Sequence, residues 1–134
     1  MAKNMFLVSK SKHSFDETIE KITEAVAKAD WRVIHTHNLQ AIMNKNGYDD
    51  VLETTVYEVC NPKLAHSLLS DESARIYSNM LPCRISIYNQ ADGATYISRM
   101  NIKMFAAQIG GKVEEVMSNA FAQAEAIIDS VVKR

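Results

Sequence analysis

Cysteine and histidine side chains that could take part in chemistry lie beside the chain's two prolines. Cys60 and His66 both fall in VCNPKLAHSLL, residues 59–69, and Cys83 follows Pro82 in MLPCRISIY. A thiolate is a nucleophile and a soft metal ligand, and an imidazole is a common ligand of metals and haem iron. No Cys-x-x-Cys spacing is present, so neither a thioredoxin-type motif nor a standard zinc site is indicated. Three interpretations stay open for the cysteines: small apolar side chains that fill strand ends, a reactive or redox thiol pair, or half of a metal site.

His66 comes one turn after an Asn-Pro pair that predicts a helix start. Asn61 is a good N-cap, and Pro62 suits the first helical position because no amide donor is needed there. The apolar residues of this helix fall on one side: Leu64, Ala65, Leu68 and Leu69. His66 points away from the centre of that stripe. It is therefore either a solvated surface residue or the polar wall of a pocket near the helix start, where free amides favour an anion.

A second pair of histidines lies in the HTH stretch. His35 and His37 share one face of the expected strand, because side chains alternate with period two. Two histidines in this arrangement could bind zinc, but a catalytic zinc needs a third protein ligand, and no other histidine is tied to the pair. Trp31 and Val33 share the same face, so the histidines could equally mark where the core meets water.

Methionines and arginines complete the candidate binding residues. Four methionines that could line an apolar pocket, or simply fill the core, are Met80, Met100, Met104 and Met117. Because there is no Cys-x-x-Cys-His, any haem would be bound non-covalently. Arg84 and Arg99 could hold a carboxylate, or they could be solvated strand ends. No G-x-S-x-G, P-loop or dinucleotide-binding motif occurs.

The pattern of apolar residues predicts the elements that must position these side chains. Strands are expected at residues 4–11, 30–38, 51–60 and in a hairpin at 83–100, and helices at 14–29, 39–47, from 62 onward and at 110–134. Ser14 and Glu17 form a capping box at the first helix, and Asp92-Gly93 is a good turn pair for the hairpin. The last helix is apolar over a wider arc than one sheet needs, which favours a dimer.

This order of elements predicts an α+β fold. Strands and helices alternate early and the chain then forms a hairpin, which indicates a two-layer sandwich of a mixed or antiparallel sheet covered by helices. At 134 residues, without a linker, repeat or low-complexity segment, residues 1–134 are expected to be one domain.

Composition limits the partners and the compartment. The net charge of -1 lacks the basic face of a nucleic-acid binder. No apolar run approaches the roughly 18 residues of a membrane span, and the run at Met5 is shorter than a signal-peptide core. We expect a cytoplasmic protein with reduced thiols that binds neither nucleic acid nor membrane.

The motifs resemble those of the DUF302 family. SFDETIEKI, VCNPKLAHSLL, LPCRISIY and a glycine-containing hairpin occur in the family's order over nearly the whole chain. The resemblance implies a two-layer TBP-like fold, a homodimer and, in some members, haem binding. The matching positions are Cys60, Asn61, Pro62, His66, Pro82 and Cys83. One departure is YSNMLPC, with polar Ser78 and Asn79 just before the Met-Leu-Pro-Cys stretch, where the family often has Leu-Leu-Leu-Pro-Cys.

Together these observations predict a binding protein. We expect a small homodimeric protein that binds a small ligand or cofactor, non-covalent haem being the first candidate, in a cleft between segments 60–66 and 80–83. His66 is the first choice for the iron ligand, with His35 and His37 as alternatives, and the cofactor-binding set is His66, Cys60, Cys83 and Met80. Two other classes stay open: a small enzyme with a reactive thiol at Cys60 or Cys83, with no catalytic set identified, and an interaction module without pocket chemistry.

Overall fold

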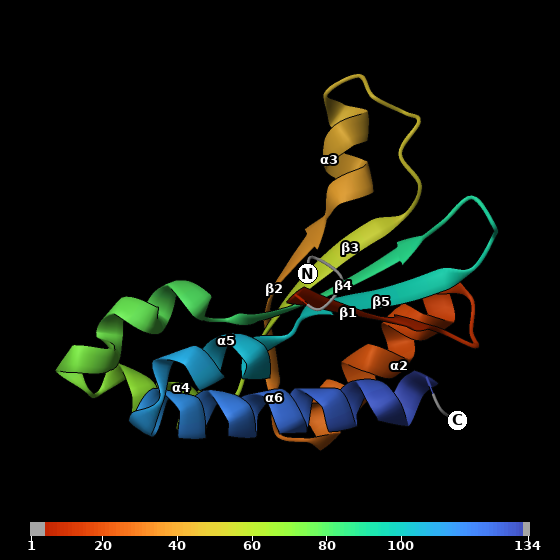
Figure 1. Ribbon diagram of the computed structural model, residues 1–134. Coiled ribbons are helices and arrows are strands. Elements are labelled where there is room, and N and C mark those ends of the chain that lie inside the picture. The colour runs from red at the N-terminus through yellow and green to blue at the C-terminus, as the bar shows by residue number, and fades with distance from the viewer. Residues whose placement is uncertain (1–4, 133–134) are drawn as a thin grey trace.

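A five-stranded antiparallel sheet forms the centre of the fold (Figure 1). The computed structural model describes residues 5–132. The strands are β1 (Phe6–Lys10), β2 (Arg32–Asn38), β3 (Thr54–Cys60), β4 (Cys83–Asn89) and β5 (Thr95–Met100). Their order across the sheet is β1-β5-β4-β3-β2, so the first and last strands in the chain lie side by side. Every pair is antiparallel, which settles the choice between a mixed and an antiparallel sheet.

One face of this sheet forms the main core. Alternate residues of β3 and β4 are buried because successive side chains point to opposite faces. The buried residues on this face are Thr55, Tyr57, Val59, Ile85, Ile87, Thr95 and Ile97. We call the opposite side, which carries Val8, Ser98, Ser86, Val56 and His37 in one row across the strands, the open face.

Helices α2 (Phe15–Lys28) and α6 (Gly111–Val132) cover the core face (Figure 1). Ser14 caps α2 by accepting from the Glu17 amide at 3.2 Å, in agreement with the expected cap. The predicted apolar stripe of α6 is buried: Val113, Met117, Ala120, Ala124, Ile127, Ile128, Val131 and Val132. The breadth of this stripe had suggested that part of it contacts a second protomer. In the structure the stripe packs against its own chain, so it does not supply a dimer interface.

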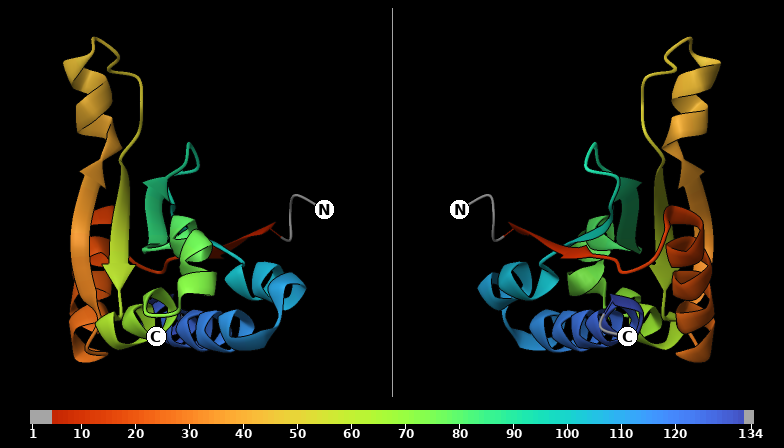
Figure 2. Two further views of the ribbon diagram at one scale, coloured as in Figure 1. Left: turned by 90° about the vertical axis from the view of Figure 1, so that its left-hand side faces the viewer. Right: turned by 90° about the vertical axis from the view of Figure 1, so that its right-hand side faces the viewer.

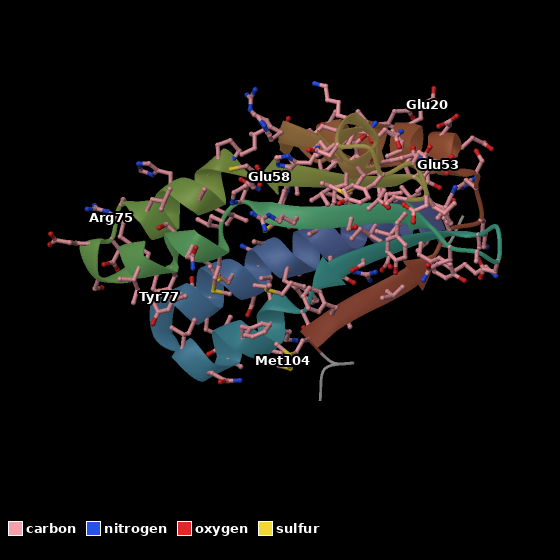
Figure 3. All side chains as sticks on the ribbon, turned by 90° about the horizontal axis from the view of Figure 1, so that it is seen from above. Glu20, Glu53, Glu58, Arg75, Tyr77 and Met104 are labelled. Atoms are coloured by element: carbon pink, nitrogen blue, oxygen red, sulfur yellow. The ribbon has the colours of Figure 1, made fainter. Side chains whose placement is uncertain are left out.

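Three shorter helical segments lie at one end of the sheet. They are α4 (Pro62–Leu69), the 3-10 helix η1 (Glu72–Met80) and α5 (Ile102–Ile109). With the start of α6 they enclose a second core of Leu68, Ala74, Ala106, Val113 and Met117. Figure 3 labels Tyr77 on η1 and Met104 on α5 at this end. Neither η1 nor α5 was predicted: η1 buries only Ala74, and α5 is separated from α6 by Gly110 alone.

Helix α3 (Leu39–Lys45) and the loop after it project beyond the ends of β2 and β3, away from α6 (Figure 2). Asn38 caps α3 by accepting from the Ala41 amide at 3.0 Å. No residue of α3 is buried. Apolar side chains along this arm are therefore exposed, among them Ile42, Tyr48 and Leu52.

The predicted α+β class, with a long C-terminal helix, is confirmed by this architecture. The predicted bounds of the first strand and last helix include Asn4, Lys133 and Arg134, which lie outside the described residues. Within residues 5–132, none of the helices combines the length and the apolar character that a membrane crossing requires.

Candidate functional site

A small space, which we call the inner cavity, lies where β3 ends and β4 begins. Its volume is about 30 Å³. The walls come from β3, α4, the segment from the end of η1 to the start of β4, and α6, with one residue just before β2 and one at the start of α5. The lining residues are Trp31, Val59, Cys60, Asn61, Leu64, Ala65, Leu68, Met80, Leu81, Pro82, Cys83, Ile102, Val116, Met117 and Ala120. Three sequence-predicted site residues, Cys60, Met80 and Cys83, thus share one cavity.

The pairing of β3 with β4 places the two cysteines on neighbouring strands, one position out of register, with their side chains on opposite faces of the sheet. Cys83 lies directly opposite Val59, the residue before Cys60, in the pairing of β3 with β4. Neither cysteine forms a disulfide in the structure, and both are half-buried. Burial, with a smaller contribution from the neighbouring Cys60 thiol, raises the pKa of Cys83 to about 11. Burial also raises the pKa of Cys60. At neutral pH both thiols are therefore protonated, which is the less nucleophilic state.

Polar groups of the inner cavity are already paired within the protein. The Trp31 indole donates to Oε1 of Gln123 at 3.0 Å, and the Asn61 amide donates to the same oxygen at 3.2 Å. The Asn61 Oδ1 accepts from the amides of Lys63 and Leu64 at 3.1 and 3.3 Å, which caps α4 as the sequence indicates. The cysteine and methionine sulfurs remain as the chemically distinctive groups of the wall.

A larger space, which we call the outer cavity, lies on the other side of the segment 80–83. Its volume is about 330 Å³, within the size range of small-molecule sites. Its walls are formed by Asn79, Met80, Leu81, Pro82, Cys83, Arg84, Ile85, Arg99, Met100, Ile102, Phe105, Phe121, Ala124, Glu125 and Ile128. Most of these side chains are apolar. Met80 and Cys83 contribute to both cavities, so this segment forms the partition between them.

The two arginines of the outer cavity differ in their availability. Arg99 is held by Glu125 through two hydrogen bonds, Nε to Oε2 at 2.7 Å and a terminal nitrogen to Oε1 at 2.6 Å. Arg84 is 70% exposed, and its Nε lies 3.4 Å from Oε2 of Glu58. Of the two, Arg84 is the cation that an anionic ligand at the rim could recruit, since the Arg99 fork is engaged inside the protein.

His66 lies outside both cavities, which corrects its placement in the predicted cleft. Its side chain is exposed on α4, whereas Leu64, Ala65 and Leu68 of the same helix line the inner cavity. The helical angle of 100° per residue turns His66 away from the side that these residues occupy. Of the two interpretations, the solvated surface residue agrees with the structure.

The His35–His37 pair lies on the open face, and neither histidine lines either cavity. The two rings share a face as predicted, with their centroids 4.8 Å apart. His37 Nε2 lies 3.5 Å from Oε2 of Glu58, which also faces Arg84 (Figure 3 labels Glu58). Across residues 5–132 there is no group of three or more histidine, cysteine or acidic side chains arranged to hold a metal ion. The third zinc ligand that this pair needs is thus not found in the described part of the chain.

Sequence reasoning missed the aromatic walls of the outer cavity. Phe105 comes from α5 and Phe121 from α6, and they line the same space only because α5 packs along α6. Met100 was singled out as a pocket methionine and does line this cavity, and Met117 lines the inner one. Met104 was also singled out, and it is not among the lining residues of either cavity. The only sequence signal for the aromatic pair is its apolar character, which does not distinguish cavity walls from core.

Comparisons with known proteins agree with this architecture. A family model described as "Domain of unknown function DUF302" matches residues 7–131. A crystal structure of an uncharacterized conserved DUF302 protein from Bacillus stearothermophilus is 20% identical, covers 95% of this chain and 98% of its own, and has a TM-score of 0.84. At that identity, the likeness shows the fold. No curated protein matches the chain at a significant level.

Proposed function

The chain belongs to the DUF302 family, and we propose that it is a binding protein for a small apolar ligand or cofactor, with non-covalent haem as the first candidate. The outer cavity is the observation on which this proposal rests. It has about 330 Å³ of space, walls that are mostly apolar, and few polar groups. This combination is typical of small-molecule sites, in which burial of apolar surface supplies affinity and a few polar groups set orientation.

The residues of the outer cavity fit haem in their chemistry. Met80 and Cys83 offer sulfur ligands of types that hold haem iron in other proteins. Phe105 and Phe121 supply aromatic surface against which a flat macrocycle can pack. Arg84, at the exposed rim, would meet the carboxylates of the cofactor. Met80 thereby replaces His66 as our first choice for the iron ligand, because His66 lies outside the cavity.

The alternative of a thiol enzyme receives less support from the geometry. A nucleophilic cysteine needs a lowered pKa, usually from a neighbouring cation or histidine. Burial instead raises the pKa of both Cys60 and Cys83, and no basic side chain lines the inner cavity among the residues described there. The cysteines are therefore better suited to packing than to attack on a substrate.

Haemin titration of the purified protein tests the proposal. We expect a saturable Soret band at one haemin per chain. Phe105→Ala removes a ring that lines only the outer cavity. Burial of this ring against the ligand contributes about 1.5–3 kcal/mol to the binding free energy, so its loss should weaken binding roughly tenfold or more. Ile76→Ala is the matched control, because Ile76 is exposed and lines neither cavity. Unsaturable binding, or the same affinity in Phe105→Ala, would contradict the proposal.

We also propose that the protein is a homodimer that forms through the open face. Phe6 and Met100 are directly paired on β1 and β5, and both are exposed, as is Val8 on the same face. An exposed apolar patch of this kind favours self-association, since a two-fold axis places the same surface of each protomer in contact. A cytoplasmic location is proposed with it. The free state of Cys60 and Cys83 supports a reducing compartment.

A further inference from the structure

Strand β1 is an edge of the sheet, and only one of its two sides has a neighbouring strand in the described part of the chain. β5 pairs with its inner side, and no strand within residues 5–132 pairs with its outer side. Figure 3, seen from above, shows β1 as the outermost strand on its side of the sheet. The main-chain N–H and C=O groups along such an edge can pair with another strand.

The hydrogen bonds to β5 identify which main-chain groups of β1 point outward. The Asn101 amide donates to the Met5 carbonyl at 2.8 Å, and the Ser11 amide donates to the Thr95 carbonyl at 2.8 Å. The register between these two bonds runs without a break. Opposite residues in an antiparallel pair alternate between hydrogen-bonded and non-hydrogen-bonded pairs. The odd-numbered residues of β1 therefore bond to β5, and the even-numbered residues direct their N–H and C=O groups outward.

The even-numbered residues of β1 also carry exposed side chains on the open face: Phe6, Val8 and Lys10. Phe6 is 50% exposed and Val8 is 56% exposed. Edge strands are commonly protected from pairing by a bulge, a proline or charged side chains. β2, the other edge, has a bulge between Val33 and His35, whereas β1 has neither bulge nor proline and carries one charge, at its end. β1 is therefore the edge that is open to another strand.

We propose that β1 pairs antiparallel with β1 of a second copy of this chain, about a two-fold axis at Val8. This inference rests on the proposed homodimer and specifies its geometry. Val8 then faces its own copy, and Phe6 faces the partner's Lys10. The groups that point outward are those that each facing pair needs for its two main-chain hydrogen bonds.

The register centred on Val8 is self-complementary, which favours a second copy as the occupant of this edge. No like charges face each other in it, whereas a register centred on Lys10 would place two lysines opposite each other, which is destabilising. Pairing about this axis joins the two sheets and makes their open faces continuous. The exposed side chains of Phe6, Val8 and Met100 then lie beside their copies and shield one another from water.

Hydrogen exchange at single residues, followed by NMR on the full chain, tests the pairing. Val8→Pro removes an outward N–H and no bond to β5, and an edge strand tolerates proline at such a position. Light scattering should give twice 15.0 kDa for the wild type and one chain for Val8→Pro. The Phe6 and Lys10 amides should exchange at least about tenfold faster in Val8→Pro, because they lose their partner carbonyls. The Leu7 and Ser9 amides are the internal control, since they bond to β5 in both proteins.

Disulfide trapping gives a second readout, which decides if circular dichroism shows that Val8→Pro does not fold. The α-carbons of a hydrogen-bonded antiparallel pair are about 5.5 Å apart, within the range that a disulfide spans. Val8→Cys should therefore form a covalent dimer under mild oxidation. Phe6→Cys should not, because its two copies would lie roughly 14 Å apart along the strands. The wild type controls for Cys60 and Cys83, which are half-buried.

The outcomes separate the edge pairing from the homodimer itself. A wild-type mass of one chain would refute both, and would leave the edge to an extended segment of a different protein. A dimer that persists in folded Val8→Pro with unchanged exchange at Phe6 and Lys10 would overturn the edge pairing alone. Trapping of Phe6→Cys as readily as Val8→Cys would do the same.

Discussion

Arg99 on β5 and Glu125 on α6 join the sheet to its covering helix through two parallel hydrogen bonds. The Nε–Oε2 distance is 2.7 Å and the second nitrogen–oxygen distance is 2.6 Å. The side chains are 10% and 21% exposed. Arg99 also donates to Oγ of Ser9 at 2.8 Å, which includes β1 in the same network. This pair forms part of the outer cavity wall, so it fixes the distance between the cavity's sheet side and its helix side.

Removal of one partner of this ion pair should destabilise the fold. Arg99→Met leaves the Glu125 carboxylate largely buried without its cation, which costs about 3–5 kcal/mol for a buried pair. The double variant Arg99→Met/Glu125→Leu should recover most of this loss, because apolar replacement of both partners is often neutral. Urea denaturation measures both free energies of unfolding. A double variant no more stable than the single one would show that the pair acts by other means.

Sequence patterns predicted those helices and strands whose own residues carry a clear periodicity or a cap. The apolar residues of α6 recur over 22 residues, and the cap residues Ser14 and Asn61 mark the starts of α2 and α4. Helix α5 is eight residues long and only Gly110 separates it from α6, so it shows no separate boundary signals. The 3-10 helix η1 buries one residue and therefore lacks a periodic stripe.

The candidate site was predictable only in part. The sequence indicated that Cys60 ends one strand and Cys83 begins another, but it did not show that these two strands are neighbours, which the pairing of β3 with β4 establishes. The predicted direction of the His66 side chain, away from the apolar stripe, agrees with the structure. Helical periodicity alone does not tell whether a pocket or solvent lies on that side. The outer cavity depends on the packing of α5 along α6, which no local pattern specifies.

The stability of the protein should fall at high pH because of Cys83. Burial raises its pKa from 9.0 to about 11, so the folded state holds this proton more tightly than the unfolded state. The resulting stability is fully present below pH 9 and is lost as the pH rises through about 11. A difference of about two units corresponds to about 3 kcal/mol. Between pH 9 and about pH 11, the free energy of unfolding of the wild type should therefore fall by about 3 kcal/mol more than that of Cys83→Ala.

Thiol reactivity should separate a packing role from a catalytic one. Both cysteines have raised pKa values, so at neutral pH native protein should react with an aromatic disulfide reagent more slowly than free cysteine does. Two thiols per chain should appear after unfolding in denaturant. Reaction faster than free cysteine would favour the enzyme alternative. Absence of free thiols after unfolding, in protein prepared without oxidant, would favour a redox pair.

Haem-iron ligation should depend on Met80 and not on His66. Met80→Leu keeps the apolar wall of the outer cavity but removes the sulfur, so we expect a shifted Soret band and at least about tenfold weaker haemin binding, equivalent to roughly 1.4 kcal/mol. His66→Ala should retain the wild-type spectrum, and its stability should change by no more than about 0.5 kcal/mol because the residue is exposed. The reverse pattern would return His66 to the site and place haem at the surface of α4.

A charge on the open face should dissociate the proposed homodimer. Val8 is 56% exposed next to the paired Phe6 and Met100, and a two-fold axis through this patch would place both copies of Val8→Glu in one interface. Like charges brought together in an interface cost several kcal/mol. Light scattering at micromolar concentration should give twice 15.0 kDa for the wild type and one chain for Val8→Glu. Ile76→Glu is the control, since Ile76 is 73% exposed and belongs to η1 rather than to a strand of the sheet. A wild-type mass of one chain would refute the dimer. Dissociation by Ile76→Glu with no effect of Val8→Glu would move the interface to η1.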